Sequence, residues 1–161
     1  MNEIEALTNG LSSIPFLLEN FIKSIPENML KKIRLENKWT IHEHVCHLTQ
    51  AEEMIYNRFH EFKTKVEPHF SAYLPGKNID TSKLIHLELN EQLNHFRSTR
   101  EKTVILIKSF DQDMWNRKAR HDEYTEYNAF IFLRHVLMHD YFHMYRIEEL
   151  WLTRDEFLRK F

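Results

Sequence analysis

The scarcity of glycine and proline constrains the fold of this chain more than any other feature of its sequence. Its 161 residues include two glycines and four prolines, and none of these six lies between Lys77 and Phe161. A β-rich fold needs such residues at its many tight turns. The sequence therefore predicts an all-α fold built from long helices.

The first two predicted helices cover residues 3–24 and 41–65, where apolar residues recur three and four positions apart. The second has the clearer start, because Thr40 can cap it and Glu43, three residues later, completes a capping box. The first contains Gly10 and Pro15, so we expect it to be kinked or to begin only near "SSIP". One short helical turn is expected in the connector between them.

The other two predicted helices cover residues 82–110 and, after a cap at Thr125 or Asn128, the segment up to Leu152. The third has the regular apolar seam of a bundle helix, which Arg100 interrupts. We expect Arg100 to form a salt bridge or, alternatively, to bind an anionic substrate group. The segment 66–80 is predicted to be a loop at the rim of a site, and the tail 154–161 to be frayed or separately helical. We expect the helices to form one four-helix-bundle domain over residues 1–161.

Composition excludes several classes of protein. The chain is 42% hydrophobic and 29% charged and has no long apolar run, which excludes a transmembrane helix. The polar first residues argue against a secretory signal, so we expect a cytoplasmic protein. A net charge of −2 without a Lys/Arg cluster excludes a nucleic-acid surface and favours a small partner. The single cysteine, Cys46, excludes an internal disulfide and a Cys-rich zinc site.

Histidines are the candidate functional residues. The chain has eleven, and His135, His139 and His143 lie four residues apart. Residues at this spacing on a helix differ in direction by about 40°, so two imidazoles can reach one ion. A neighbouring helix must supply a third ligand, and His47 is a candidate because it lies on a partly apolar face of the second helix. The alternative for each is a core histidine that is hydrogen-bonded to a neighbour.

Other metal and nucleophile motifs are absent from the sequence. No Glu-x-x-His occurs, which argues against a carboxylate-bridged di-iron site. The segment "HEHVC" has a cysteine where the zinc-protease motif His-Glu-x-x-His needs its second histidine. Neither Gly-x-Ser-x-Gly nor a glycine-rich phosphate loop is present.

Two segments, "KWTIHEHVCHLTQAEE" and "RHVLMHDYFHMYRIEEL", resemble the DinB/YfiT-like superfamily of small four-helix metalloproteins. The family pattern is a tryptophan, a histidine eight residues later and, near the end of the chain, His-x-x-x-His followed by an isoleucine or leucine. Trp39 and His47 match the first part, and His139, His143 and Ile147 match the second.

The resemblance implies one divalent metal ion bound by His47, His139 and His143, with zinc or nickel expected and iron or manganese as further candidates. Characterised members include bacillithiol transferases and mycothiol-dependent isomerases and transferases. The resemblance therefore implies a thiol-dependent transferase or related hydrolase, with a small thiol and an electrophile as substrates, and a homodimer. Arg146 stands where the family often has glutamine, so the substrate does not follow from the resemblance.

The remaining histidines near these positions have other predicted roles. His42 is expected to be exposed in the first turn of its helix, and His44, about 60° from His47, to be a neighbour of the site. His135 is interpreted as a core or supporting residue, and His86 as a residue on the seam of the third helix.

Four further predictions concern residues around the site. Glu43 is expected to cap its helix rather than to orient His47, and Asp140 to be solvated. Cys46 is expected to be buried and inert. An aromatic row is expected to combine core packing with either a pocket wall or a dimer face. This row is Tyr141, Phe142, Tyr145 and Trp151.

Three hypotheses for the function remain open. The leading one is a metal-dependent thiol transferase or hydrolase, for which no catalytic residue beyond the ligands is assigned. The second is a non-enzymatic metal-binding or stress-associated interaction protein, in which the ion braces two helices. The third is a metal-free bundle with histidines in its core. Metal content and metal-dependent conjugation of a thiol distinguish them.

Overall fold

The computed structural model describes residues 2–72 and 81–158, and this part of the chain contains four long helices. The short elements are α2 (Glu27–Leu30), α5 (Gln112–Asn116), the 3₁₀ segments η1 (Thr81–His86) and η2 (Asp155–Phe157), and the strands β1 (His69–Phe70) and β2 (Arg120–His121). The long helices are α1 (Glu3–Ser24), α3 (Ile41–Thr64), α4 (Leu89–Lys108) and α6 (Ala129–Leu152). The predicted all-α four-helix bundle is confirmed.

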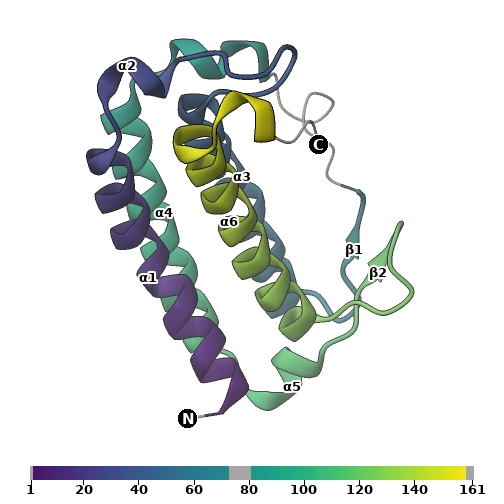
Figure 1. Cartoon of the computed structure of the whole chain (residues 1–161). Coiled ribbons are helices and arrows are strands. Elements are labelled where there is room, and N and C mark those ends of the chain that lie inside the picture. The colour runs from purple at the N-terminus through teal and green to yellow at the C-terminus, as the bar shows by residue number, and fades with distance from the viewer. Residues whose placement is uncertain (1, 73–80, 159–161) are drawn as a thin grey trace.

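The long helices do not simply alternate in direction around the bundle. As Figure 1 shows, α1 and α6 run one way, and α3 and α4 run the other. Both α1 and α3 pack against α4 and α6. Each helix therefore has one parallel and one antiparallel neighbour, and the chain must return along the bundle between α3 and α4. In that return segment β1 pairs in parallel with β2, with His69 opposite Arg120.

The predicted helix starts are confirmed where a cap was recognised. The Thr40 hydroxyl accepts a hydrogen bond from the Glu43 amide (3.3 Å), and the Thr40 amide donates to the Glu43 carboxylate (2.8 Å). This reciprocal pair is the capping box. Asn128 rather than Thr125 caps α6, because its side chain accepts from the Ile131 amide at 2.7 Å.

The prediction of the third helix is wrong for its first part. Residues 82–110 do not form one helix, because η1 ends at His86 and α4 begins at Leu89. Only Leu84 of η1 is buried, so an exposed His86 lies outside the apolar seam to which it was assigned. Part of the predicted rim loop, residues 73–80, lies outside the described residues, as do residues 159–161 of the tail.

The first helix is continuous from Glu3 to Ser24, so the expectation that it begins only near "SSIP" is wrong. Gly10 packs against Leu137 of α6, where an added Cβ would lie 3.1 Å from a methyl group. Pro15 has no N–H, so it cannot donate to the Leu11 carbonyl one turn earlier. Arg100 of α4 donates to that carbonyl instead, at 3.3 Å. The bundle thus satisfies a backbone group that the proline leaves open.

Arg100 connects all four long helices. Its guanidinium, which is 1% exposed, donates to Glu52 of α3 (2.9 Å) and to Asp140 of α6 (2.7 Å), in addition to Leu11 of α1. The predicted salt bridge is confirmed. Asp140, predicted to be solvated, is fully buried because α4 brings this arginine against it. Burial alone would raise the pKa of Asp140, but the charge of Arg100 lowers it below its ordinary value.

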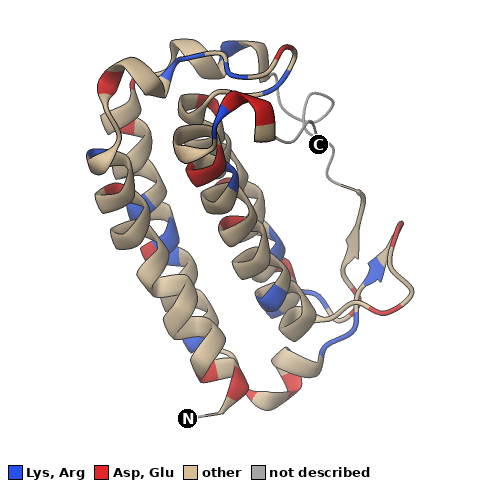
Figure 2. Ribbon diagram, viewed as in Figure 1, with Lys and Arg blue, Asp and Glu red and all other residues tan. Residues whose placement is uncertain are grey.

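The surface carries both signs of charge. Lys/Arg and Asp/Glu positions are interspersed along the long helices in the view of Figure 2. In the described part of the chain, no helix is both long and apolar enough to span a membrane.

Candidate metal centre

Facing stripes of α3 and α6 bring three predicted ligands together. His139 and His143 are one turn apart on α6, and His47 projects from the antiparallel helix α3. The Nε2 atom of His139 lies 3.3 Å from Nε2 of His47 and 3.1 Å from Nε2 of His143. One ligand atom from each of the three residues lies within 4.8 Å of the others.

The donor set fits a divalent transition metal. Two nitrogens bound at 2.0–2.1 Å in a zinc tetrahedron are about 3.3 Å apart, which is close to the two separations observed. Burial lowers the pKa of His47 to about 3, with further contributions from His139 and His44. Burial also lowers the pKa of His143 well below its ordinary range. These two imidazoles are therefore neutral at pH 7, as metal ligands must be.

Two further side chains face the outer nitrogens of the α6 histidines. The Nδ1 atoms of His44 and His143 are 2.8 Å apart, so one of them carries the proton of a buried hydrogen bond. Asp140 Oδ1 lies 3.9 Å from Nδ1 of His139, which is too long for a hydrogen bond. Its buried charge still favours a proton on Nδ1. The charge of Asp140 therefore favours the tautomer of His139 whose Nε2 lone pair is available to an ion, and His143 has that tautomer when its Nδ1 donates to His44.

Trp39 packs against the rings of two candidate ligands, His47 and His143. Its ring centroid lies 4.6 Å from that of His47 and 6.1 Å from that of His143, and it meets the His143 ring at 25°. The indole therefore fixes the planes of two candidate ligands. Trp39 precedes the capping residue Thr40, so the capping box that starts α3 also positions this ring.

A comparison with protein-family models identifies the family. Residues 15–147 match the model of the DinB superfamily, which is most of the chain. The chain belongs to the DinB superfamily. No match was found among the curated proteins with which the sequence was compared.

The fold of this DinB-superfamily chain is also similar to a solved structure, that of YfiT from Bacillus subtilis. The two share 16% sequence identity over 93% of this chain and 87% of the YfiT chain, with a TM-score of 0.82. YfiT is described as a probable metal-dependent hydrolase with an unusual four-helix bundle topology. At this identity the likeness establishes the fold alone.

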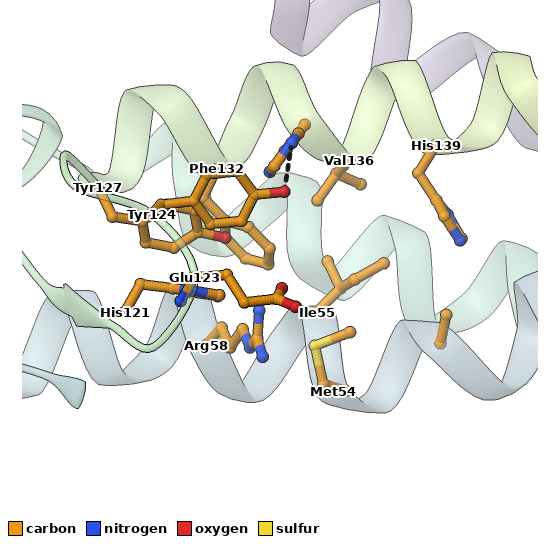
Figure 3. A pocket seen from close by; sticks show the side chains of 12 residues that line it. Met54, Ile55, Arg58, His121, Glu123, Tyr124, Tyr127, Phe132, Val136 and His139 are labelled. Atoms are coloured by element: carbon orange, nitrogen blue, oxygen red, sulfur yellow. Dashed lines mark hydrogen bonds between the residues drawn. The ribbon is translucent and has the colours of Figure 1, made fainter. Parts of the chain in front are cut away.

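A cavity of about 240 Å³ adjoins the histidines. It lies between α3 and α6, and His139 stands at one end of the row of lining side chains in Figure 3. The wall beside His139 is apolar, and Arg58, Glu123 and His121 lie toward the other end. The apolar wall is formed by Ala51, Met54, Ile55, Phe132 and Val136. The side chain of His139 is 33% exposed, so the cluster is open on this side.

Of three further histidines, His44 and His135 agree with their predictions as residues beside or outside the ligand set, and His42 does not. His135 is not in the cluster; it lines the cavity, and its Nε2 lies 3.3 Å from the Tyr124 hydroxyl (Figure 3). His44 is a neighbour of the site, as predicted. The prediction for His42 is wrong, because this side chain is only 2% exposed. Residues of η1 cover the start of α3, and sequence alone did not indicate this packing.

Cys46 is fully buried, as predicted, and burial raises the pKa of its thiol to about 12. It therefore remains protonated and is not a nucleophile.

Arg146, at the position that departs from the family pattern, is buried and paired with Glu149.

The aromatic row on α6 divides into two parts. Trp151 packs against Phe21 of α1, with ring centroids 6.1 Å apart. Tyr141, Phe142 and Tyr145 are about half exposed and do not line the cavity beside His139. The pocket-wall interpretation is therefore wrong for this cavity, and the homodimer stays a prediction.

Proposed function

We propose that this chain binds one divalent transition metal ion through Nε2 of His47, His139 and His143, and that it uses the ion in thiol transfer to, or hydrolysis of, a small molecule held in the adjoining cavity. The observation that carries the proposal is the convergence of these nitrogens at the end of a largely apolar cavity. The description of YfiT as a probable metal-dependent hydrolase supports it as well.

The donor set bears on the identity of the metal. Three neutral imidazoles suit zinc and nickel, and also iron, better than manganese, which prefers oxygen ligands. With three protein ligands, such an ion keeps an open coordination position, at which it lowers the pKa of a bound water or thiol.

The protein's own residues supply position and environment. Trp39 and His44 hold the candidate ligands in place, and the buried pair of Arg100 and Asp140 fixes the turn of α6 that carries His139. The cavity wall beside His139 is apolar, so it can pack against an apolar part of a substrate. Because this side is open, catalysis is favoured over a purely structural ion, whose site would be closed.

Metal analysis of purified protein tests the first half of the proposal. Wild type is expected to retain about one equivalent of zinc or nickel, and His143→Ala to lose it. His135→Ala is the matched control, because it removes a histidine of the same helix that lines the cavity but lies outside the cluster. A wild-type protein that stays metal-free after zinc or nickel is added contradicts the proposal.

Turnover tests the second half. The metal-loaded protein is incubated with a low-molecular-weight thiol and a panel of electrophiles and esters, beside His143→Ala. Metal-dependent conjugation or hydrolysis supports the proposal. If neither reaction depends on the metal for any substrate, the non-enzymatic alternative with a structural ion is favoured.

A further inference from the structure

Among the described residues, Arg58 is a partly buried arginine that has no carboxylate partner and lines the cavity beside the histidines. Six arginines in the described part of the chain are not exposed. Arg34, Arg97, Arg100 and Arg146 each pair with an Asp or Glu side chain. Arg117 donates to carbonyls at the end of α3. Among the described residues, no carboxylate oxygen lies within 4.0 Å of a nitrogen of the sixth, Arg58.

The guanidinium of Arg58 is held in place by residues 70–71 and by α6. It donates to the backbone carbonyl of Ser71 at 2.7 Å. The guanidinium carbon lies 5.2 Å from the ring centroid of Phe70 and 5.8 Å from that of Phe132. The contact to Ser71 uses one of its five N–H donors, and an interaction with Tyr127 occupies part of the rest. A fixed arginine with spare donors in a cavity is preorganised to bind an anion.

Arg58 and the metal centre face the same cavity. Arg58 follows His47 by eleven residues on α3, which is close to three full turns, so both lie on one face of the helix about 16 Å apart along its axis. Side chains of a helix lean toward its N-terminus, so the guanidinium lies nearer to the histidines than its Cα does. In Figure 3 the side chains of Met54 and Ile55 lie between Arg58 and His139.

We propose that the cavity binds a small molecule with a carboxylate at Arg58, an apolar middle part against Met54 and Ile55, and its reacting end at His139. The placement of the reacting end rests on the proposed function, whereas the carboxylate site does not. A monoanion matches the charges of the cavity better than a phosphate dianion. Arg58 is the one Lys or Arg among the residues that line it, and Glu123 lines it too.

The neighbouring histidines do not add a second cation. Burial, followed by the charge of Arg58, lowers the pKa of His121. Burial, followed by the charge of Arg134, lowers the pKa of His135. Both imidazoles are therefore neutral at pH 7, where they can serve as hydrogen-bond partners for an uncharged part of the ligand.

A matched pair of probes tests the carboxylate site: hexanoate and hexanamide, titrated into the full-length protein at pH 7 and followed by NMR. Wild type is expected to bind the acid about tenfold or more tightly than the amide, because only the acid makes charge-assisted hydrogen bonds. Arg58→Gln should abolish this preference, and Arg58→Lys should weaken it, since a lysine keeps the charge but loses the planar fork.

Two further variants make the test specific. Arg134→Gln removes an exposed arginine of α6 outside the cavity and should leave the preference unchanged. Glu123→Gln removes the competing negative charge and should increase the affinity for hexanoate. A wild type that binds neither probe, or that binds both equally, overturns the proposal. So does a folded Arg58→Gln variant that keeps the wild-type preference.

The same titration without metal separates this inference from the proposed function. The preference for the acid is expected in metal-free protein, where no ion can bind the carboxylate, and Arg58→Gln should abolish it there. If zinc does not bind but the preference is present, the proposed metal function fails and the carboxylate site stands. A mercaptocarboxylic acid that reaches both sites should bind zinc-loaded protein more tightly than metal-free protein.

Discussion

The hydrogen bond between His44 and His143 gives the sharpest prediction about metal binding. If Nδ1 of His143 donates to Nδ1 of His44, the Nε2 lone pair of His143 is free for an ion. The opposite arrangement places the proton on Nε2 of His143 and blocks the ligand. Replacing His44 by leucine keeps a similar volume but removes the acceptor at 2.8 Å.

The expected loss is about 10- to 100-fold in zinc affinity, the usual effect of removing the outer partner of a histidine ligand. This corresponds to about 1.4–2.7 kcal/mol. His44 is 7% exposed, so water does not readily replace the lost acceptor. His44→Asn should retain most of the affinity, because its side-chain oxygen takes the place of Nδ1.

Zinc affinity is measured by competition with a chromophoric chelator at pH 7, and thermal unfolding of the metal-free variants measures stability separately. His42→Leu is the matched control, since His42 is also a buried histidine of α3 but lies outside the three-histidine cluster. If His44→Leu binds zinc as tightly as wild type, or if His42→Leu loses as much affinity, the positioning argument is wrong.

Two further predictions concern stability. Arg100→Met leaves two buried carboxylates without their cation and should lower the free energy of unfolding by about 3–5 kcal/mol. Arg97→Met breaks a more exposed pair and should lower the free energy of unfolding by less than about 1 kcal/mol. Urea unfolding measures both, and equal losses would contradict the role of Arg100. Burial, aided by neighbouring charges, lowers the pKa of His44 to about 4 and of His47 to about 3 in the folded state. The unfolded chain therefore binds more protons below about pH 6.5, so metal-free protein is expected to lose up to about 3 kcal/mol per imidazole as the pH falls from 6.5 to about 4. Urea midpoints in chelator that do not change over this range would refute the assignment.

Local features of the sequence were sufficient for most of the fold. Helix periodicity and the capping box of Thr40 and Glu43 depend on residues three or four apart, and both predictions are confirmed. The break between η1 and α4 was missed because no glycine or proline marks it. Tertiary contacts decide where that helix starts: η1 packs over the start of α3, with Leu84 buried.

The candidate site, too, was predictable from the sequence only in part. The spacing of His139 and His143 indicated a ligand pair, and the family resemblance supplied His47. The burial of Asp140 was not predictable, because it depends on an arginine forty residues away on another helix. The contact between His44 and His143, the cavity and the place of Arg58 in it likewise depend on how α3 and α6 are rotated toward each other.

The sequence by itself determined that this chain forms long helices and that His139 and His143 lie one turn apart on one face of the last of them. Both properties follow from the helical repeat, which is a local property of the backbone. Only the tertiary structure decided which groups orient those histidines and what kind of molecule can lie beside them. Those properties depend on distances between helices, and the helical repeat of a single segment carries no information about its neighbours.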